Sequence, residues 1–227
     1  ITVQQTLEEA FSTILRQPVQ ITGCGRTDTG VHARNYVAHM DADVEESASR
    51  VVYQVNAILP PDIAIRHLEP APPDFHARFQ AIDRLYKYYI HFEKNPFLNG
   101  QSFFFQRNST LDADAMQQMA ELLLRFDRFK PFCKTGSDAE HFLCHMIESH
   151  WTFSASDAVY TVRANRFLRG MVRLIVGTCL NVGLGKVTIG QIEECLITQT
   201  MLPQAWSVPP EGLFLEEVRY PIHPDTA

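Results

Sequence analysis

The chain has 227 residues, of which 45% are hydrophobic and 20% charged, so it can build a packed core and is unlike a disordered protein. A net charge of -6 differs from the basic footprint of most nucleic-acid binders, but a locally positive surface is compatible with it. No apolar stretch approaches the about 20 residues needed to cross a bilayer, which argues against a membrane protein.

The first part of the chain is expected to interleave helices with short strands. An apolar stripe of helical spacing and a capping box at Thr2 and Gln5 indicate an opening helix. Pro60 and Pro61 end a second helix. The predicted elements are a helix over 2–15, a strand over 19–24, a returning strand over 35–41, a helix over 47–59 and a short strand over 63–68.

The rest of the chain begins with the clearest predicted strand, over 84–92, whose alternation places Tyr86, Tyr88 and Ile90 on one face. The further predicted elements are a helix over 111–126, two strands within 145–162, helices over 167–182 and 188–198, and a closing strand over 213–220. This order does not repeat a regular βαβ unit, so it predicts an α+β fold with mixed or antiparallel sheets and flanking helices. We expect two α/β lobes, over residues 1–94 and 95–227.

A glycine-rich turn over 23–30 carries Asp28 directly after a predicted strand. Three glycines in eight residues allow a tight turn and a close approach to a ligand. Asp28 is either an Asx-turn residue bonded to its own backbone or a catalytic carboxylate held by a rigid element. A phosphate-binding loop has less support, because the third glycine and the lysine of such loops are missing.

Two further patterns have both an ordinary and a functional interpretation. Periodicity alone makes Tyr86 a sheet residue, whereas an exposed phenol ring on a strand also suits stacking against a nucleobase. Arg166, Arg169 and Arg173 have the spacing of one helical face. That face is either simply solvated, or it contacts phosphates and supplies one arginine that favours the charged form of the catalytic carboxylate. Gly177 would permit close packing of this helix.

The cysteines and histidines do not predict a metal site. One group is scattered with spacings unlike those of a zinc site, so structural or surface roles are expected; its members are Cys133, His141, Cys144, His145 and His150. The five cysteines include no CxxC pair, which favours reduced thiols in a cytoplasmic protein. We expect no metal and no organic cofactor.

Several segments together resemble one family. Residues 25–33, GRTDTGVHA, resemble the signature of the tRNA pseudouridine synthase A family. Five more segments resemble that family in the same order and extend the likeness over nearly the whole chain; they are NAILPPDI at 56–63, FHARF at 75–79, RLYKY at 84–88, MVRLIVG at 171–177 and EGLFL at 211–215. The family commonly has Gly-Gln where this chain has Asn35-Tyr36.

The resemblance implies a role for individual residues. Asp28 would be the nucleophile, Tyr86 would stack on the target uridine, and Arg173 would pair with Asp28. Arg26 and Arg78 would help to hold the RNA.

The resemblance also implies an activity and partners. The expected fold has an active-site cleft between two lobes, and the expected enzyme is a homodimer that modifies uridines 38, 39 and 40 in the anticodon stem-loop of tRNA without a cofactor. Two other hypotheses remain open. One is a tRNA-binding protein without catalysis, which needs no carboxylate at Asp28. The other is a nucleotide-dependent enzyme that uses the glycine-rich turn for a small molecule.

Overall fold

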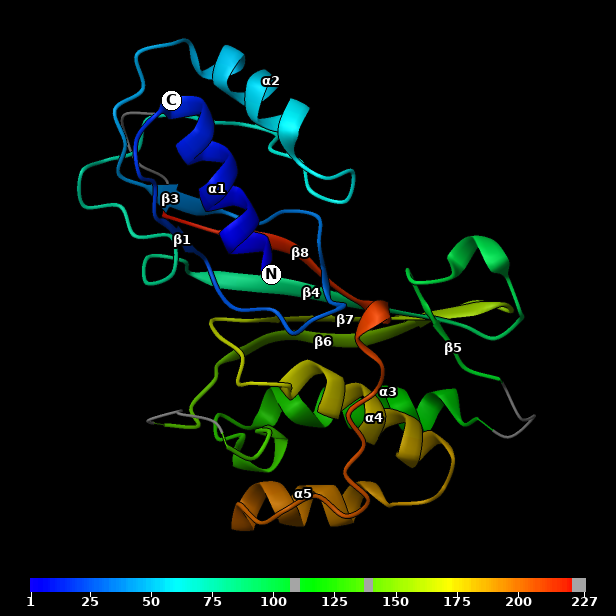
Figure 1. Ribbon diagram of the computed structural model, residues 1–227. Coiled ribbons are helices and arrows are strands. Elements are labelled where there is room, and N and C mark those ends of the chain that lie inside the picture. Colours follow the sequence, from blue (N-terminus) through cyan, green and yellow to red (C-terminus); the bar gives the residue numbers. More distant parts are fainter. Residues whose placement is uncertain (107–110, 137–140, 222–227) are drawn as a thin grey trace. The chain divides into compact units, whose positions relative to one another are not determined.

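The computed structural model describes residues 1–106, 111–136 and 141–221, and it divides the chain into two compact units (Figure 1). Unit 1 comprises Ile1–Arg26 and Tyr36–Ala81, and unit 2 comprises Thr27–Asn35 and Ile82–Ala227. The mixture of helices with parallel and antiparallel strand pairs confirms the predicted α+β class.

The expected division between residues 94 and 95 does not coincide with these units. Strand β4, Asp83–His91, pairs along its whole length with β7, Asp157–Ala164, and so belongs with the later part of the chain. The segment Thr27–Asn35 joins the same unit because it contributes a strand to that sheet.

Unit 1 contains two helices and a short antiparallel strand pair within the described residues: α1 Val3–Leu15, β1 Ile21–Gly23, β3 Ala38–Met40 and α2 Ala48–Ile58. The hydroxyl of Thr2 accepts from the backbone N–H of Gln5 at 3.1 Å, which is the capping bond expected at this helix start. Phe11 of α1 and Val51 and Val55 of α2 are buried in one small core.

The strand predicted over 63–68 is not formed. The side chain of Asn56 instead bonds both backbone groups of Ile65, donating to its carbonyl at 2.8 Å and accepting from its N–H at 2.7 Å. An asparagine amide carries the donor and the acceptor that a neighbouring strand would supply. The extended segment is therefore satisfied without a sheet partner.

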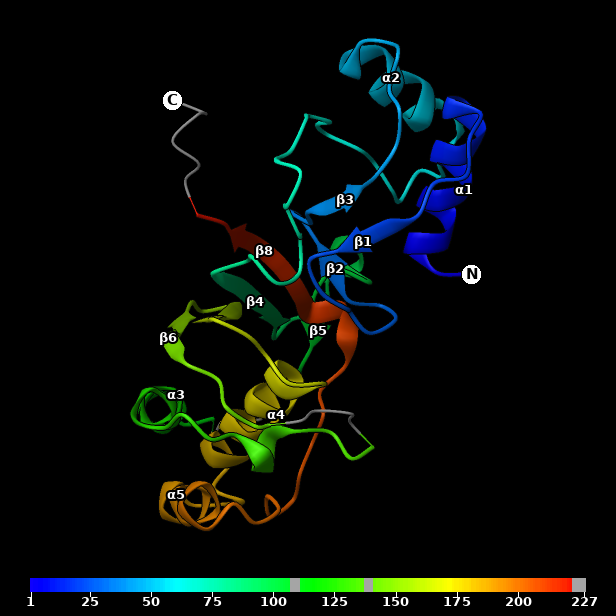
Figure 2. The same ribbon diagram turned by 90° about the vertical axis from the view of Figure 1, so that its left-hand side faces the viewer.

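Unit 2 is built on one mixed sheet of the order β2-β8-β4-β7-β6, with β5 added beside β4 (Figures 1 and 2). Its strands are β2 His32–Ala33, β4 Asp83–His91, β5 Phe103–Phe104, β6 Met146–Phe153, β7 Asp157–Ala164 and β8 Leu213–Arg219. β2 runs parallel to β8, with His32 opposite Phe214. The two strands predicted within 145–162 and the strands predicted over 84–92 and 213–220 are confirmed.

Three helices of unit 2 follow the predicted order: α3 Ala113–Leu122, α4 Met171–Gly183 and α5 Ile189–Thr198. Helices α3 and α4 cover one face of the sheet, and α5 lies beyond them (Figure 1). The core between sheet and helices includes Tyr88, Tyr160, Met116 and Ile175, all fully buried. Within the described ranges, no helix combines the length and the apolar character of a membrane span.

Helix α4 begins later than predicted. Its N-cap is Gly170, which adopts a left-handed conformation with φ of 69°. The preceding backbone bonds to other segments, since the N–H of Lys134 donates to the carbonyl of Arg169 at 3.0 Å and Arg84 donates to that of Asn165 at 2.8 Å. Residues 165–170 are therefore a loop.

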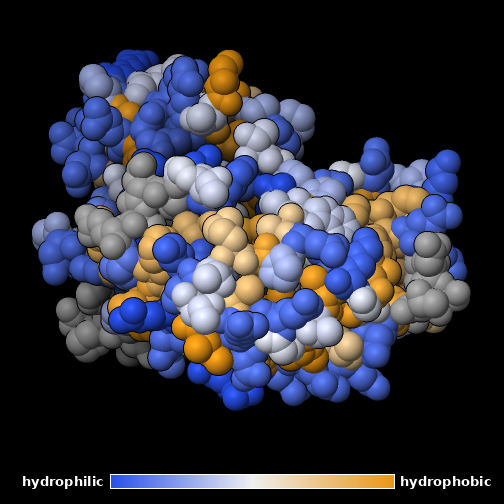
Figure 3. Space-filling view, turned by 90° about the horizontal axis from the view of Figure 1, so that it is seen from below, coloured by the Kyte–Doolittle hydropathy of each residue, from blue (hydrophilic) through white to orange (hydrophobic). Residues whose placement is uncertain are grey.

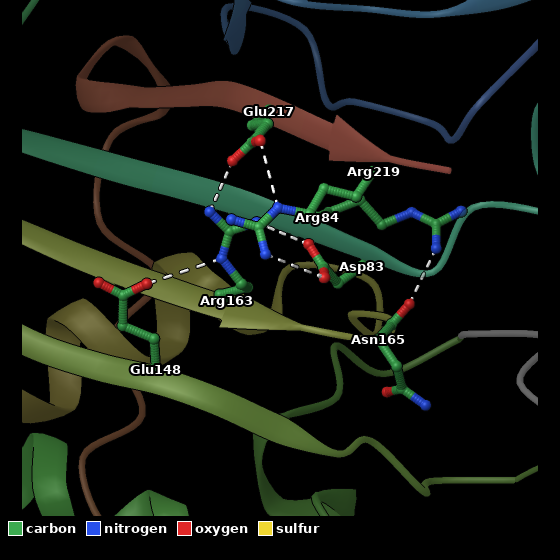
Figure 4. A network of polar contacts seen from close by, with 7 residues as sticks. All are labelled: Asp83, Arg84, Glu148, Arg163, Asn165, Glu217 and Arg219. Atoms are coloured by element: carbon green, nitrogen blue, oxygen red, sulfur yellow. Dashed lines mark hydrogen bonds and ion pairs between the residues drawn. The ribbon is translucent and has the colours of Figure 1, made fainter. Parts of the chain in front are cut away.

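A network of charged side chains joins β4, β7 and β8 (Figure 4). Arg163 donates to Asp83 and to Glu217, at 2.6 Å each, and approaches Glu148 at 3.6 Å. Burial disfavours the charged guanidinium, but these hydrogen bonds outweigh it and raise the pKa of Arg163. Arg219 lies 3.2 Å from Glu217 on the outer side of the network.

Candidate active site

The glycine-rich loop is closed by its own backbone and leaves the side chain of Asp28 available. The N–H of Val31 donates to the carbonyl of Asp28 at 3.1 Å, which makes a tight turn. Gly30 has φ of 83°, and a Cβ there would lie 2.9 Å from Pro210, so this position requires glycine. Strand β2 follows the turn at once and fixes the loop on the edge of the sheet.

Asp28 forms an ion pair with Arg173, in the first turn of α4. The guanidinium Nη1 donates to Oδ2 of Asp28 at 2.9 Å. The side chain of Asp28 is 34% exposed and that of Arg173 is 15% exposed, so the carboxylate is held in place yet reachable. The carboxylate thus bonds a distant arginine, in contrast to the Asx-turn alternative.

A second acceptor fixes the direction of the arginine. Nε of Arg173 donates to the carbonyl of Val208 at 2.7 Å, and the N–H of Val208 donates back to the carbonyl of Arg173 at 3.4 Å. One helical turn further along α4, a Cβ on Gly177 would overlap the carbonyl oxygen of Trp206. Gly177 therefore allows the segment 206–212, here called the strap, to approach α4 closely, as the sequence predicted for this glycine.

The strap contacts both sides of the ion pair. The hydroxyl of Tyr88 donates to the carbonyl of Pro209 at 2.7 Å, and Pro210 lies against Gly30 of the aspartate loop. Burial is the main reason that the pKa of Tyr88 is raised far above its ordinary value, so its hydroxyl stays protonated as a donor. The strap therefore links α4, β4 and the loop of Asp28.

Tyr86 lies in the same sheet as the aspartate loop. On β8, Leu215 is opposite Ala33 of β2 on one side and opposite Tyr86 of β4 on the other. The three residues are thus level across adjacent strands, which places Tyr86 about 10 Å from Ala33. The ring of Tyr86 is partly buried and meets Phe167 edge-on, with 5.2 Å between ring centroids.

Arg166 and Arg169 are not on the helix that carries Arg173, so the predicted face of three arginines is wrong. Both precede the N-cap Gly170 and lie in the loop of residues 165–170. Nη1 of Arg166 lies 2.9 Å from Nε2 of His141, and Nη1 of Arg169 donates to the carbonyl of Gly136 at 3.2 Å. The three arginines have helical spacing in the sequence, but helix α4 begins only after Gly170, which has a positive φ.

Arg26 and Arg78 belong to unit 1, and both are exposed. The guanidinium of Arg78 lies 5.6 Å from the ring centroid of Phe79, which is 74% exposed. Also in unit 1, the hydroxyl of Tyr36 donates to the carbonyl of Gly25 and covers Gly23. The Asn35-Tyr36 departure from the family pattern therefore has a structural role at the start of the glycine-rich loop.

Among the described residues, no three His, Cys, Asp or Glu side chains converge in a way that could hold a metal ion. Burial raises the pKa of Cys144 to about 11 and that of Cys179 to about 12, so neither thiol is a ready nucleophile at neutral pH.

The strap was missed by sequence reasoning. Its contacts with Arg173 and Tyr88 use the backbone carbonyls of Val208 and Pro209. Because every residue has a backbone carbonyl, the residue types do not indicate such contacts. The available signals were the adjacent prolines 209 and 210 and the glycines at positions 30 and 177, which allow close approach.

Comparison with known proteins gives one consistent result. A family model described as tRNA pseudouridine synthase matches residues 120–221, a range that includes Arg173. The tRNA pseudouridine synthase A of Porphyromonas gingivalis is 42% identical over 96% of this chain and 88% of its own length. The enzymes of the same name from Bacteroides thetaiotaomicron and Bacillus subtilis are 40% and 32% identical, over 96% of this chain and 82% and 90% of their own lengths. The chain belongs to the tRNA pseudouridine synthase A family, whose members are isomerases that convert uridine to pseudouridine.

Proposed function

We propose that this chain isomerises uridine to pseudouridine at positions 38, 39 and 40 in the anticodon stem-loop of tRNA, with Asp28 as the nucleophile. The observation that carries the proposal is the partly exposed Asp28 carboxylate held at 2.9 Å by Arg173. The names of the relatives support the tRNA substrate.

The reaction suits a site that offers a carboxylate and an arginine. The bond from C1′ to N1 breaks, the base rotates, and a bond from C1′ to C5 forms, while the proton on C5 is replaced by one on N1. The reaction is therefore redox-neutral. A carboxylate nucleophile divides such an exchange into two displacements, and it must be aimed before the substrate arrives. Arg173, itself held by the carbonyl of Val208, orients the carboxylate of Asp28 and stabilises its negative charge.

The other site residues have binding roles in this proposal. The target base must leave its stack, and Tyr86 offers a ring against which it can rest and a phenol that can form hydrogen bonds. Arg26, Arg78, Arg166 and Arg169 are exposed or partly exposed cations for the RNA backbone. The proposed reaction uses no cofactor. The proposed enzyme is a homodimer that binds one tRNA across both subunits. A cytoplasmic location agrees with the five cysteines, which are buried and form no disulfide.

Release of tritium tests this function, because C5 loses its hydrogen only when uridine is isomerised. The purified chain is mixed with tRNA labelled at C5 of uridine, and the modified positions are then mapped in the product. We expect release that stops at the number of target uridines and pseudouridine confined to the anticodon stem-loop. Binding of tRNA without release would support the non-catalytic alternative and refute the proposal.

A further inference from the structure

A cavity of about 380 Å³ in unit 2 lies apart from the residues assigned to catalysis. Its lining is Arg128, Lys130, His141, Phe142, Leu143 and Gln199, and we call it the basic pocket. Two chain segments form its walls and pair with each other, because Arg128 and Leu143 form an antiparallel bridge and the N–H of Phe129 donates to the carbonyl of Phe142 at 2.9 Å.

Gln199 fixes the base of the pocket at the end of α5. Its amide donates to the carbonyl of Arg128 at 3.1 Å and accepts from the N–H of Lys130 at 3.3 Å. The residue has φ of 56° and is the C-cap of α5, a position at which helices commonly adopt the left-handed conformation. The pocket is thus held by specific contacts.

The two charged residues that line the pocket, Arg128 and Lys130, are both cations. The side chains of Arg128 and Lys130 form no ion pair with another described residue, and Arg166 adds a third cation through its contact with His141 at 2.9 Å. The nearby carboxylate of Asp127 lies 3.4 Å from His145. A second cavity of about 390 Å³ near α5 provides a contrast, because it is lined by Glu194 and neutral residues and by no cation.

Further cationic residues lie in the segments that connect the basic pocket with α4. Lys134 bonds through its N–H to the carbonyl of Arg169, and Arg169 precedes the N-cap of the helix that carries Arg173. Arg166 and Arg169 belong to the same loop, which connects the pocket rim to α4. Seen from below, the surface shows hydrophobic residues among polar ones (Figure 3).

We propose that the basic pocket binds a backbone phosphate of the same tRNA whose uridine lies at Asp28; this rests on the proposed function. Cations in the pocket and in the loop before α4 match a polyanion that extends away from the reacting nucleotide. Arg128 and Lys130 contact the phosphate, and the apolar walls at Phe142 and Leu143 lie against the adjoining ribose. The contact adds affinity and takes no part in the chemistry.

The test removes the two charges and measures how binding depends on salt. Arg128→Gln with Lys130→Gln is compared with Arg50→Gln with Arg125→Gln, a control that loses the same charge from arginines already paired with Glu46 and Glu193. Both pairs of substitutions are made in an Asp28→Asn background, so that turnover does not affect the equilibrium. We expect the pocket variant to bind tRNA about tenfold more weakly and to lower the slope of log K against log salt by about one to two, while the control leaves both unchanged.

Two further measurements distinguish the possible failures. With Asp28 intact, the pocket variant should keep the wild-type single-turnover rate at saturating tRNA, and Arg128→Lys with Lys130→Arg should restore the salt slope. A salt slope equal to that of the control variant would overturn the pocket proposal and leave the proposed function standing. The same holds if the pocket variant loses affinity for polyglutamate, an acidic polymer without phosphate, but not for tRNA. Absence of tritium release by the wild-type chain would instead refute the function, whatever the slope.

Discussion

Two of the arginine–aspartate ion pairs in unit 2 lie in different environments. Arg163 and Asp83 are 7% and 6% exposed and lie 2.6 Å apart within the sheet. Arg173 and Asp28 lie 2.9 Å apart, and the carboxylate is 34% exposed. The first pair is surrounded by further charges, Glu217 and Glu148 among them, whereas the second is completed by a backbone carbonyl.

The difference separates the two roles that such an ion pair can have, one in stability and one in chemistry. A buried pair with several partners ties three strands together, and its charges are not accessible to a substrate. A pair at the surface of a cavity or loop contributes less to stability, but its carboxylate can meet a reactant. Charge pairing alone therefore does not identify a catalytic residue, and of these two carboxylates that of Asp28 is the more exposed, as its proposed role requires.

The largest expected effect is on the partly exposed pair of Asp28 and Arg173, here called the open pair. Asp28→Asn should lower the rate of pseudouridine formation by at least about 10³-fold, because an amide is a very poor nucleophile. Its unfolding free energy should stay within about 1 kcal/mol of the wild type, since the side chain is partly solvated. Single-turnover tritium release and denaturant titration measure the two quantities. Near-normal turnover would contradict the role assigned to Asp28.

The buried pair should show the opposite result. Arg163→Met should reduce the unfolding free energy by about 3–5 kcal/mol, because the buried carboxylate of Asp83 loses its hydrogen-bonded cation and keeps only Arg219, at 4.0 Å. Arg173→Met is the matched control, and its loss of stability should be clearly smaller. Urea denaturation followed by circular dichroism measures both variants. Equal losses would show that the two environments do not differ in the way described.

A third prediction sharpens the comparison at the backbone carbonyl that completes the open pair. Gly177→Ala should cost about 1–3 kcal/mol of stability and slow turnover, because the added methyl displaces Trp206 and with it Val208. Gly190→Ala in α5 is the control, since the nearest atom to its Cβ is 4.0 Å away. A thermal melt and a single-turnover rate are compared for the two. If turnover is unchanged while Gly177→Ala is destabilised, the strap does not position Arg173.

The smallest predicted effect concerns pH. The hydrogen bond from Arg163 lowers the pKa of Glu217 below its ordinary value. The stability it contributes is therefore fully present above the unfolded pKa of about 4.3 and is lost as the pH falls through the lower, folded pKa. Glu217→Gln should thus flatten the decline of unfolding free energy between about pH 5 and about pH 3. A decline as steep as that of the wild type would assign the acid sensitivity to other groups.

Much of the fold was predictable because its signals are local. The capping box at Thr2 and the alternation along 84–92 each specify an element without reference to distant residues. The failures came from long-range contacts. Asn56 satisfies Ile65 and prevents the strand expected there, and bonds from Lys134 and Arg84 keep residues 165–170 out of the helix.

The candidate site was predictable to a different extent. The resemblance implied the pairing of Asp28 with Arg173, and the structure contains that pair. It gave no information on the strap, because the strap acts through carbonyl groups that every residue has. Nor did the sequence show that Arg163, on the strand that precedes the loop before α4, is buried among carboxylates.

The chain passes from unit 1 to unit 2 and back around the loop of Asp28, because residues 27–35 belong to unit 2 while their neighbours on both sides belong to unit 1. A fragment that starts at Ile82 would contain most of the large core but neither the carboxylate nor β2. It would expose the edge of β8 that β2 now covers, and exposed edges invite aggregation. The two units therefore cannot be separated by a single cut. A split or circularly permuted form must keep residues 27–35 attached to the sheet of unit 2 to retain the pair of Asp28 and Arg173.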